Sequence, residues 1–366
     1  MKIALFADAQ SIHIQQLAPG LAELGHEVHI VTHKPAPVMG ATVERFRVPE
    51  PSATNLRGWQ GRRSRYLRGF LRRFDVVNIH FLQDWGFRFD PPLIENAVLV
   101  ATAWGSDIFD PPGETVASTE LTEVRRTLLR RAHAVSACGP AFAERVAEYA
   151  GVAADHIEVL PFGVDVDLFR PAQRATRHAA PFRIGFFKGF RAVYGPTVLM
   201  EAIPLILRRV PGTRFDLVGD GAELHQCQSM ASEAGLQSSI EWLPRQPHER
   251  LPDLLSRWDL TVVPSIHEAF GVAALESSAA GVPVVASDVC GLRDTVRHGE
   301  TGLLVPPSNP GALADAIVEL LHDGELRERM ARAGPKMVGR EYDWRDLHAR
   351  WAEFYDRVRE GAVVMT

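Results

Sequence analysis

The chain has 366 residues, 46% of them hydrophobic and 23% charged, which suits a folded globular protein with two hydrophobic cores. Its formal net charge of −5 gives no sign of a nucleic-acid partner. The three cysteines, Cys138, Cys227 and Cys290, lack the spacing of a zinc site or a disulfide framework, so we expect reduced thiols in a cytoplasmic protein. No apolar run approaches the roughly 18 residues of a membrane span.

Short apolar runs alternate with helical patterns along the first half of the chain. The runs expected to form strands are KIALFA, EVHIVT, DVVNIH, AVLVAT and AVSA, at residues 2–7, 27–32, 75–80, 97–102 and 134–137. Residues 12–24 carry apolar side chains at helical spacing and are followed by Gly25, which predicts a helix. Continuous apolar strands that alternate with helices predict an α/β fold with a parallel sheet covered on both faces.

The same pattern restarts in the second half, with expected strands FRIGFF, TRFDLVG, LTVVP, VPVVAS and TGLLVP. The break at 165–181 contains two prolines and the polar run QRATRH, which indicates a linker. We therefore predict two doubly wound, Rossmann-like domains at residues 1–170 and 180–343. Ligands of open α/β sheets bind beyond the carboxyl ends of the strands, so two facing domains would place the ligand in a cleft between them.

The C-terminal segment, residues 344–366, begins with an amphipathic pattern. Its apolar residues at helical spacing are Trp344, Leu347, Trp351, Phe354, Tyr355 and Val358. The pattern predicts a helix that docks one face on another part of the protein.

Two glutamates, Glu268 and Glu276, mark the most informative segment, SIHEAFGVAALESSAAGVPVVASD at residues 265–288. Their spacing does not place both carboxylates on one helix face, so we expect Glu268 on a loop and Glu276 inside a helix that starts near Phe270. A helix N-terminus suits an anion such as a diphosphate, and carboxylates beside it can accept hydrogen bonds from sugar hydroxyls. Glutamates at this spacing are also common as solvated helix residues.

This segment resembles the donor-binding Glu-x7-Glu segment of retaining GT-B glycosyltransferases of family 4, and the likeness spans nearly the entire chain. The resemblance implies an acceptor-binding first domain, a nucleotide-sugar-binding second domain, and a C-terminal helix that crosses back onto the first. It implies that Glu276 holds the ribose and Glu268 the donor sugar, with Phe270 and Gly271 in the same site. It also implies retention of anomeric configuration, no metal and no other cofactor, and no acidic pair of DxD type lies in a suitable loop.

The loop after residues 182–187 carries Lys188, Gly189 and Arg191. A cationic, glycine-bearing loop at the end of a strand can bind phosphate oxygens, although a solvated turn has the same composition. The family places a Gly-Arg pair here and a Lys-Gly pair six residues later. In this chain Gly189 occupies the arginine position and Tyr194 the lysine position. We therefore expect Lys188, with Arg191, to replace the usual cations at the diphosphate.

Three further segments are assigned to the donor by resemblance. The turn at Gly219 would border the nucleotide, and a plain tight turn is the alternative. Arg245 and Gln246 would lie along the base. Gly291 and Leu292 would point backbone N–H groups at a phosphate, although the surrounding residues depart from the family's Gly-Gly-x-Pro-Glu pattern.

The first domain offers candidates at the ends of its strands. Ser11 and His13 follow the first strand, His80 ends the third, and Trp104 follows the fourth. Relatives often carry a histidine at the position of Trp104; a tryptophan can stack on a pyranose but cannot shuttle a proton. We expect these four residues to bind the acceptor. Asp107 is a candidate catalytic residue that binds hydroxyls, or alternatively a cap for the following segment.

The stretch from Arg57 to Arg73 carries seven arginines and no acid, interleaved with aromatic and aliphatic residues. Such a segment can lie on anionic lipid at the inner face of the membrane, or bind a phosphorylated acceptor. An ordinary solvated helix ahead of the strand at 75–80 is the alternative.

The sequence thus predicts a glycosyltransferase, with a hexose as the expected sugar, that moves it from a nucleoside-diphosphate sugar to a hydroxyl of a polysaccharide, a lipid-linked acceptor or a small molecule. Two alternatives stay open at this stage. One is a nucleotide-sugar enzyme of another type, such as an epimerase. The other is a non-catalytic nucleotide-sugar binder, because the phosphate loop is altered.

Overall fold

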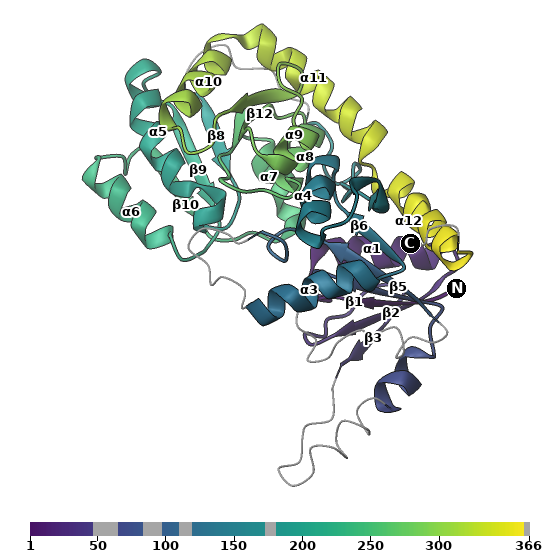
Figure 1. Ribbon diagram of the computed structural model, residues 1–366. Helices are drawn as coiled ribbons and strands as arrows, with labels where there is room; N and C mark the ends of the chain where they lie inside the picture. Colours follow the sequence, from purple (N-terminus) through teal and green to yellow (C-terminus); the bar gives the residue numbers. More distant parts are fainter. Residues whose placement is uncertain (47–64, 83–96, 110–118, 173–180, 362–366) are drawn as a thin grey trace. The chain divides into compact units, whose positions relative to one another are not determined.

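The computed structural model describes residues 1–46, 65–82, 97–109, 119–172 and 181–361. The chain divides into two units (Figure 1). The first comprises Met1–Asp110, Thr115–Phe162 and Trp344–Thr366, and the core of the second is Gly163–Asp343. The second unit thus begins earlier than residue 170, where the sequence places the end of the first domain. Phe169 accounts for the difference, since its side chain is 1% exposed and packs on His248 of the second unit.

A parallel sheet forms the centre of the first unit, in the order β3-β2-β1-β4-β5-β6-β7. Its strands are β1 (Lys2–Phe6), β2 (Glu27–Thr32), β3 (Ala41–Arg45), β4 (Val76–His80), β5 (Val98–Ala103), β6 (Ala134–Ala137) and β7 (Ile157–Val159). Every residue of β4 and β6 is buried, as expected for strands covered on both faces. The five strands predicted for this half are confirmed, and the edge strands β3 and β7 are additional.

Four helices of this unit have bounds in the described chain: α1 (Ile12–Glu23), α3 (Thr119–Arg131), α4 (Pro140–Ala150) and α12 (Trp344–Arg359). The C-terminal helix α12 packs on α1, close to the opposite end of the sequence. His348 Nε2 lies 3.0 Å from the carbonyl oxygen of Gln16. Gly20 permits this approach, since a Cβ there would lie 2.1 Å from the His348 ring.

A chain of buried polar side chains joins α12 to the middle of the sheet. Asn78 Nδ2 donates to the Tyr355 hydroxyl at 2.7 Å, and Thr102 Oγ1 donates to Asn78 Oδ1 at 2.8 Å. Thr102 Oγ1 also lies 2.8 Å from Ser136 Oγ. All four side chains are at most 3% exposed. Because buried polar groups are costly without partners, this chain specifies where α12 sits on its own unit.

The second unit is built on a parallel sheet in the order β10-β9-β8-β11-β12-β13. Its strands are β8 (Arg183–Phe186), β9 (Arg214–Val218), β10 (Ile240–Leu243), β11 (Leu260–Val263), β12 (Val284–Ser287) and β13 (Gly302–Val305). The five strands predicted for this half are confirmed, and β10, at one edge, is additional. Neighbouring strands β8 and β11 form the topological switch point, because the connections from them run to opposite sides of the sheet.

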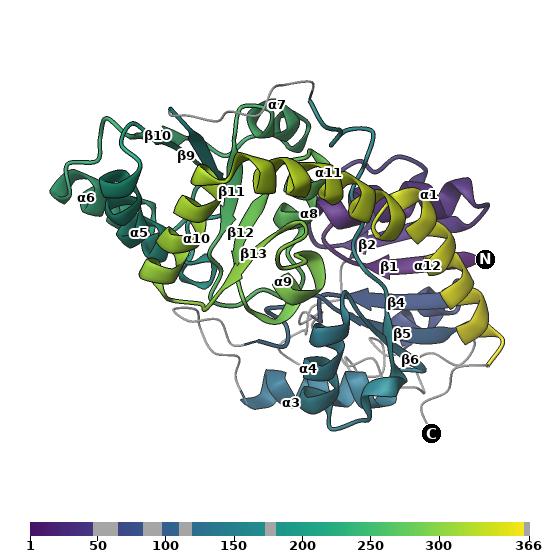
Figure 2. The same cartoon turned by 90° about the horizontal axis from the view of Figure 1, so that it is seen from above.

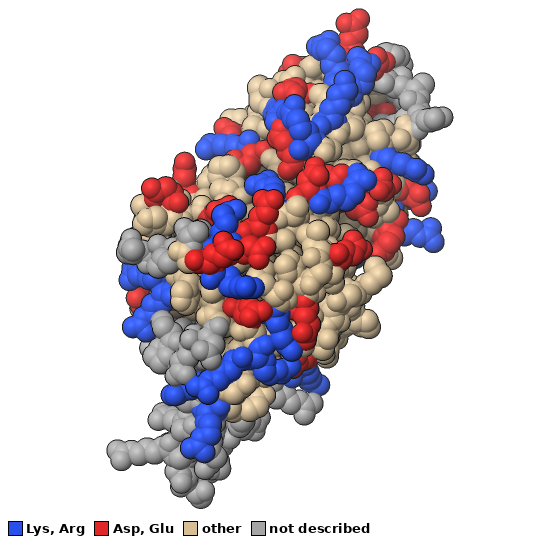
Figure 3. Space-filling view, turned by 90° about the vertical axis from the view of Figure 1, so that its right-hand side faces the viewer, with Lys and Arg blue, Asp and Glu red and all other residues tan. Residues whose placement is uncertain are grey.

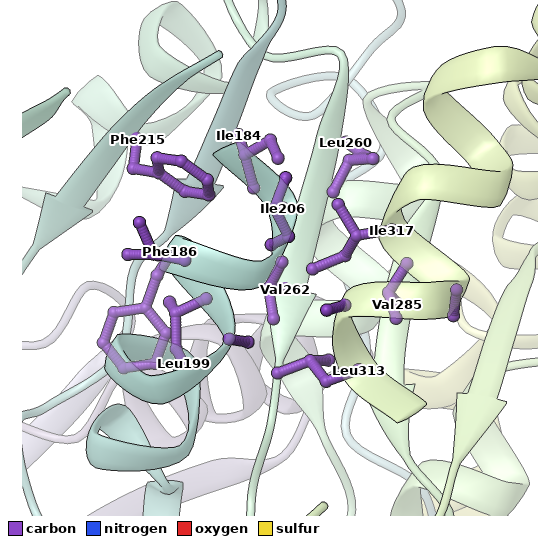
Figure 4. Packing of buried hydrophobic residues seen from close by; sticks show 14 of the residues in the cluster. Ile184, Phe186, Leu199, Ile206, Phe215, Leu260, Val262, Val285, Leu313 and Ile317 are labelled. Atoms are coloured by element: carbon purple, nitrogen blue, oxygen red, sulfur yellow. The ribbon is translucent and has the colours of Figure 1, made fainter. Parts of the chain in front are cut away.

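Helices cover both faces of this sheet (Figure 2). They are α5 (Pro196–Arg209), α6 (Leu224–Glu233), α7 (Leu251–Leu255), α8 (Val272–Ala279), α9 (Cys290–Thr295), α10 (Pro310–His322) and α11 (Gly324–Glu341). On one face, Leu199 and Ile206 of α5 and Ile317 of α10 pack on Val262 and Val285 (Figure 4). On the other, α8 and α9 cover a smaller cluster. The architecture is two Rossmann-like α/β units, as the sequence predicts.

None of the helices in the described part of the chain is both long and apolar enough to cross a membrane. Figure 3 shows Lys and Arg side chains interspersed with Asp and Glu over the upper and middle parts of the face that it draws, with Lys and Arg predominating toward its lower end. This mixture accords with the small negative net charge of the sequence.

Candidate active site

Lys188 and Glu268 meet at the topological switch point of the second unit. Lys188 follows β8 and Glu268 follows β11, so both lie beyond the carboxyl ends of adjacent strands. The Lys188 ammonium donates a short hydrogen bond to Glu268 Oε2, which also accepts one from Ser265 Oγ at 3.1 Å. Each side chain of the ion pair is 12% exposed. The structure therefore brings together two residues that the sequence could only propose separately.

The electrostatics of this pair keep Lys188 charged. Burial alone would lower the pKa of Lys188, but the carboxylate of Glu268 more than offsets this, and the pKa stands above its ordinary value. A positively charged ammonium at this point can stabilise the negative charge of a diphosphate.

Tyr194, which occupies the position of the family's lysine, contacts both candidate cations. The Lys188 Nζ lies 4.2 Å from the centre of the Tyr194 ring, and the Arg191 guanidinium carbon lies 5.6 Å from it. Cation–π attraction of this kind holds both cations beside one ring. Lys188 and Arg191 are thus both in place, and Lys188 is the one in direct contact with Glu268.

Gly219 shapes the loop that carries Lys188. Its φ is +145°, and a Cβ there would lie only 2.4 Å from the Lys188 carbonyl oxygen. The next residue's carbonyl, that of Asp220, accepts a hydrogen bond from Phe190 N at 2.7 Å. The turn after β9 therefore packs against the backbone of the Lys188 loop and hydrogen-bonds to it. At Gly189 a Cβ would make only ordinary contact, 3.5 Å from Asp220 O, so packing does not demand glycine there.

Glu276 lies in α8, inside the helix as predicted, and is 6% exposed. Its Oε1 lies 2.7 Å from His248 Nε2. Burial acts to lower the pKa of His248, but the Glu276 carboxylate outweighs it and raises that pKa above the ordinary value. Sequence reasoning missed His248, since nothing in the spacing of residues 248 and 276 links the loop after β10 to the middle of α8.

The predicted phosphate contact through Gly291 and Leu292 is wrong in this structure. Gly291 N donates to the Glu268 carbonyl at 2.9 Å, and Leu292 N donates to Val289 O at 3.0 Å, so neither amide is available. A Cβ at residue 291 would lie 2.2 Å from Phe270 N, which explains the glycine. This segment holds the Glu268 loop in place.

Phe270 and Gly271, predicted to lie in the donor site, both shape the start of α8, and donor contact by either residue stays a prediction. Phe270 is 3% exposed and packs on the Tyr342 ring. Gly271 has φ +102°, and a Cβ there would lie 2.6 Å from Leu292 Cδ2. It allows the chain to turn directly into α8, whose first amides, those of Val272 and Ala273, have no hydrogen-bond partner in the described chain. Such a helix start can accept an anion.

Arg245 and Gln246 follow the edge strand β10. Arg245 is exposed, and Gln246 Nε2 donates to the carbonyl of Pro244, two residues earlier, at 2.9 Å. Among the described residues no contact joins either side chain to Lys188, Glu268 or Glu276. Their assignment to the base stays a prediction.

In the first unit, three of the four predicted acceptor residues form one aromatic cluster. The His13 ring stacks on Phe162 with centroids 3.8 Å apart and meets Trp104 edge-on at 5.4 Å. Trp104 in turn contacts His80 at 5.6 Å. Ser11 is the N-cap residue of α1, two positions before His13. The cluster lies at the carboxyl ends of β1, β4 and β5, which are neighbours in the sheet.

His80 lies deeper in this cluster than the sequence indicates. It is 1% exposed and contacts Trp351 of α12, and burial lowers its pKa to about 3, so the ring is neutral. Within the described part of the chain, both His80 ring nitrogens, Trp104 Nε1 and Trp351 Nε1 are buried without a hydrogen-bond partner. Ordered water, or hydroxyl groups of a substrate, would satisfy such groups. Direct contact of His80 with an acceptor stays a prediction.

Asp107 does not fit the predicted catalytic role. Its side chain is fully buried, and its carboxylate accepts hydrogen bonds from the amides of Trp104, Gly105 and Leu82 at 2.6 to 3.2 Å. Burial raises its pKa, although these bonds act in the opposite direction. The alternative, a local cap, is what the structure contains: Asp107 fixes the backbone that presents Trp104.

The basic stretch at 57–73 lies partly outside the described residues, which begin again at Arg65. In the described part, Leu67 and Leu71 are buried. Arg73 donates to both Glu44 oxygens, at 3.0 and 2.7 Å, and stacks on the rings of Phe70 and Phe74. The contacts of Arg73 stabilise the fold of the first unit, which agrees with the alternative of an ordinary amphipathic helix at this part of the stretch. Membrane contact by the remainder stays a prediction.

Two family models match the chain: Glycosyltransferase Family 4 over residues 10–168, and Glycosyl transferases group 1 over residues 173–337. A D-inositol 3-phosphate glycosyltransferase of Corynebacterium urealyticum is 28% identical over 391 residues, covering 95% of this chain and 90% of that protein.

Solved structures share the fold. Sucrose-phosphate synthase from Thermosynechococcus elongatus matches with a TM-score of 0.81 at 22% identity, over 98% of this chain and 99% of that one. Anabaena HepE in complex with UDP matches with a TM-score of 0.78 at 20% identity, over 97% of this chain and all of that one (100%). The family models and the fold together define an enzyme of the GT-B glycosyltransferase class. The chain belongs to the group 1 glycosyltransferases, family 4.

Proposed function

We propose that this glycosyltransferase moves a hexosyl group from a nucleoside-diphosphate sugar to a hydroxyl acceptor, with retention of configuration and without a metal. The observation that carries the proposal is the Lys188–Glu268 ion pair at the switch point of the second unit, with Glu276 in the helix that follows. It offers one cation for a diphosphate and two carboxylates for hydroxyl groups.

In this proposal the second unit binds the donor. Glu276 accepts hydrogen bonds from the ribose and Glu268 from the transferred sugar, while Lys188 and Arg191 neutralise the diphosphate. Lys188 and Glu268 bind each other in the structure, so donor binding must break this ion pair. In its place the diphosphate binds Lys188, and a hydroxyl of the sugar donates to Glu268. A nucleotide without its sugar would leave Glu268 with a weaker partner, so we expect the intact donor to bind more tightly.

The first unit then supplies the acceptor site, at His13 and Trp104 with Ser11 beside them. An indole stacks well on the apolar face of a pyranose. With no proton-shuttling histidine at position 104, the departing phosphate is the base that removes the acceptor proton on the same face. Because the chain has only three cysteines, Cys138, Cys227 and Cys290, without the spacing of a disulfide framework, we further propose a cytoplasmic location.

Thermal shifts with UDP, GDP, ADP and dTDP and their common sugars, in the presence of a chelator, test donor binding. UDP comes first because HepE was solved with UDP and with UDP-glucose. A selective shift by one nucleotide, larger with one sugar, supports a metal-independent donor site. No shift with any nucleotide would remove the basis of the proposal.

Variants then separate the roles. Lys188→Met should lower kcat about 100-fold, because one preorganised charge at the leaving group is lost. The matched control is Lys336→Met, which changes an exposed lysine of α11 that has no ion-pair partner among the described residues. Glu276→Gln should weaken donor binding about tenfold. The control is Glu319→Gln on the surface of α10, which should leave donor binding unchanged. Equal turnover by Lys188→Met and wild type would contradict the assignment. Product formed from the donor without any acceptor would favour an epimerase instead.

A further inference from the structure

The partner of Glu276 is a histidine from a different part of the second unit. His248 opens the 3-10 turn His248–Arg250 after β10, and Glu276 lies 28 positions further along in α8. Their side chains are 21% and 8% exposed, and the His248 Nε2 and Glu276 Oε1 atoms are 2.7 Å apart. A contact this short between poorly solvated groups fixes the carboxylate in one orientation.

Packing holds the imidazole itself in place. The Phe169 ring lies against it with centroids 5.0 Å apart. Among the described residues, the charged groups that act on His248 are Glu276 from α8, Glu249 on its own turn and Asp165 from the start of the unit. All three are acids. The Lys188 ammonium pairs with Glu268, so His248 is the cationic partner that Glu276 contacts directly.

The second oxygen of this carboxylate is the chemically important one. Oε1 is taken by His248, whereas Oε2 has no hydrogen-bond partner in the described chain. A carboxylate held by one oxygen presents the other in a defined direction, which preorganises it for a ligand hydroxyl.

We propose that His248 is a positioning residue of the donor site: it binds Glu276 Oε1 and leaves Oε2 to accept from the ribose hydroxyls. This inference rests on the proposed function, in which Glu276 holds the ribose. It adds a residue, and it makes donor affinity depend on pH.

The direction of that dependence follows from charge. While His248 is protonated it neutralises Glu276, and a diphosphate binds next to a pair of no net charge. The pairing raises the His248 pKa above its ordinary value, so the ring keeps its proton to higher pH than a free imidazole and loses its charge as pH rises through the raised value. Above that range Glu276 carries an uncompensated negative charge, and affinity for a nucleoside diphosphate falls.

The first test needs no ligand. In full-length protein labelled at histidine, NMR titration should place the His248 pKa above 6.5 in the wild type, and Glu276→Gln should return it toward or below that value. A His248 pKa unchanged by Glu276→Gln would overturn the pairing, whatever the protein binds.

The second test measures affinity for the nucleoside diphosphate that gives the largest thermal shift among UDP, GDP, ADP and dTDP. His248→Leu should weaken its binding about tenfold and raise the donor KM, with kcat unchanged at saturation, since the ribose contact is remote from the reacting bond. His248→Gln keeps an N–H donor of similar reach, so it should restore most of the affinity and lose the extra pH dependence of the wild type. The control is His322→Gln, the same substitution at an exposed histidine of α10, which should leave nucleotide affinity unchanged.

The two proposals fail differently. If Glu276→Gln weakens nucleotide binding but His248→Leu does not, His248 has no positioning role and the donor site stands. If Glu276→Gln leaves binding unchanged, the ribose assignment fails, and the role of His248 fails with it.

Discussion

Replacing Tyr355 by phenylalanine should destabilise the first unit through a single lost hydrogen bond. The Tyr355 side chain is fully buried, and burial raises the pKa of its hydroxyl, which therefore stays protonated. Phenylalanine fills nearly the same volume, so packing on Trp351 and Phe354 is kept. What changes is Asn78 Nδ2, which loses its acceptor at 2.7 Å and becomes a buried donor without a partner.

The cost of that orphaned donor is about 1–3 kcal/mol. In a unit of this size, 1 kcal/mol moves the melting temperature by about 2–4 °C. We therefore expect Tyr355→Phe to lower the transition of the first unit by roughly 2–12 °C, measured by calorimetry. Tyr66→Phe makes the same chemical change on a side chain that is 42% exposed and should leave the melting temperature within about 1 °C.

A double-mutant cycle separates the bond from the packing. Because Asn78 also accepts from Thr102 Oγ1, the cycle is measured in a Thr102→Val background. There Asn78→Leu together with Tyr355→Phe removes both partners, and replacing both by apolar groups is nearly neutral. The double variant should therefore melt above Tyr355→Phe alone. Two additive losses, or a Tyr355→Phe variant as stable as Tyr66→Phe, would refute the account of how α12 is held.

Two further predictions concern the second unit. Gly195→Ala should lower its melting temperature by more than about 5 °C, because φ is +62° and the new Cβ would lie 2.1 Å from Pro264 O. The control is Gly212→Ala, at φ +83° but in open space, which should lower the melting temperature clearly less. Equal decreases for the two variants would rule out the clash at Gly195. Asp216→Asn should cost about 1–3 kcal/mol in urea denaturation, since this 1% exposed carboxylate accepts from Trp258 Nε1 at 2.8 Å. A neutral result there would mean that the charge of Asp216 contributes nothing to the buried contact.

The sequence was sufficient for most of the fold. The ten strands predicted from apolar runs are all present, because central parallel strands are buried on both faces and carry a continuous pattern. The three that it missed, β3, β7 and β10, are all edge strands. β3, for example, has no fully buried residue, so its sequence ATVER shows no apolar run. An edge strand pairs on one side only and needs less apolar surface.

The candidate site was predictable in its parts but not in its contacts. Lys188 and Glu268 could be placed at strand ends from local patterns, but their ion pair joins positions 80 apart and depends on the strand order. The same holds for His248 and Glu276. The opposite error, at Asp107 and at Gly291, arose because a polar side chain or a free-looking amide was taken to face a ligand. Local sequence does not reveal that backbone groups of the same chain already bind them.

The attachment of α12 also bears on the order in which the protein is made. Asn78 and Tyr355 are 277 positions apart, and the main segment of the second unit, Gly163–Asp343, is synthesised between them. This segment carries all six strands of its sheet and can fold as it leaves the ribosome, whereas the sheet of the first unit lacks its covering helix until α12 emerges. The unit whose synthesis begins first is therefore expected to be the last one completed.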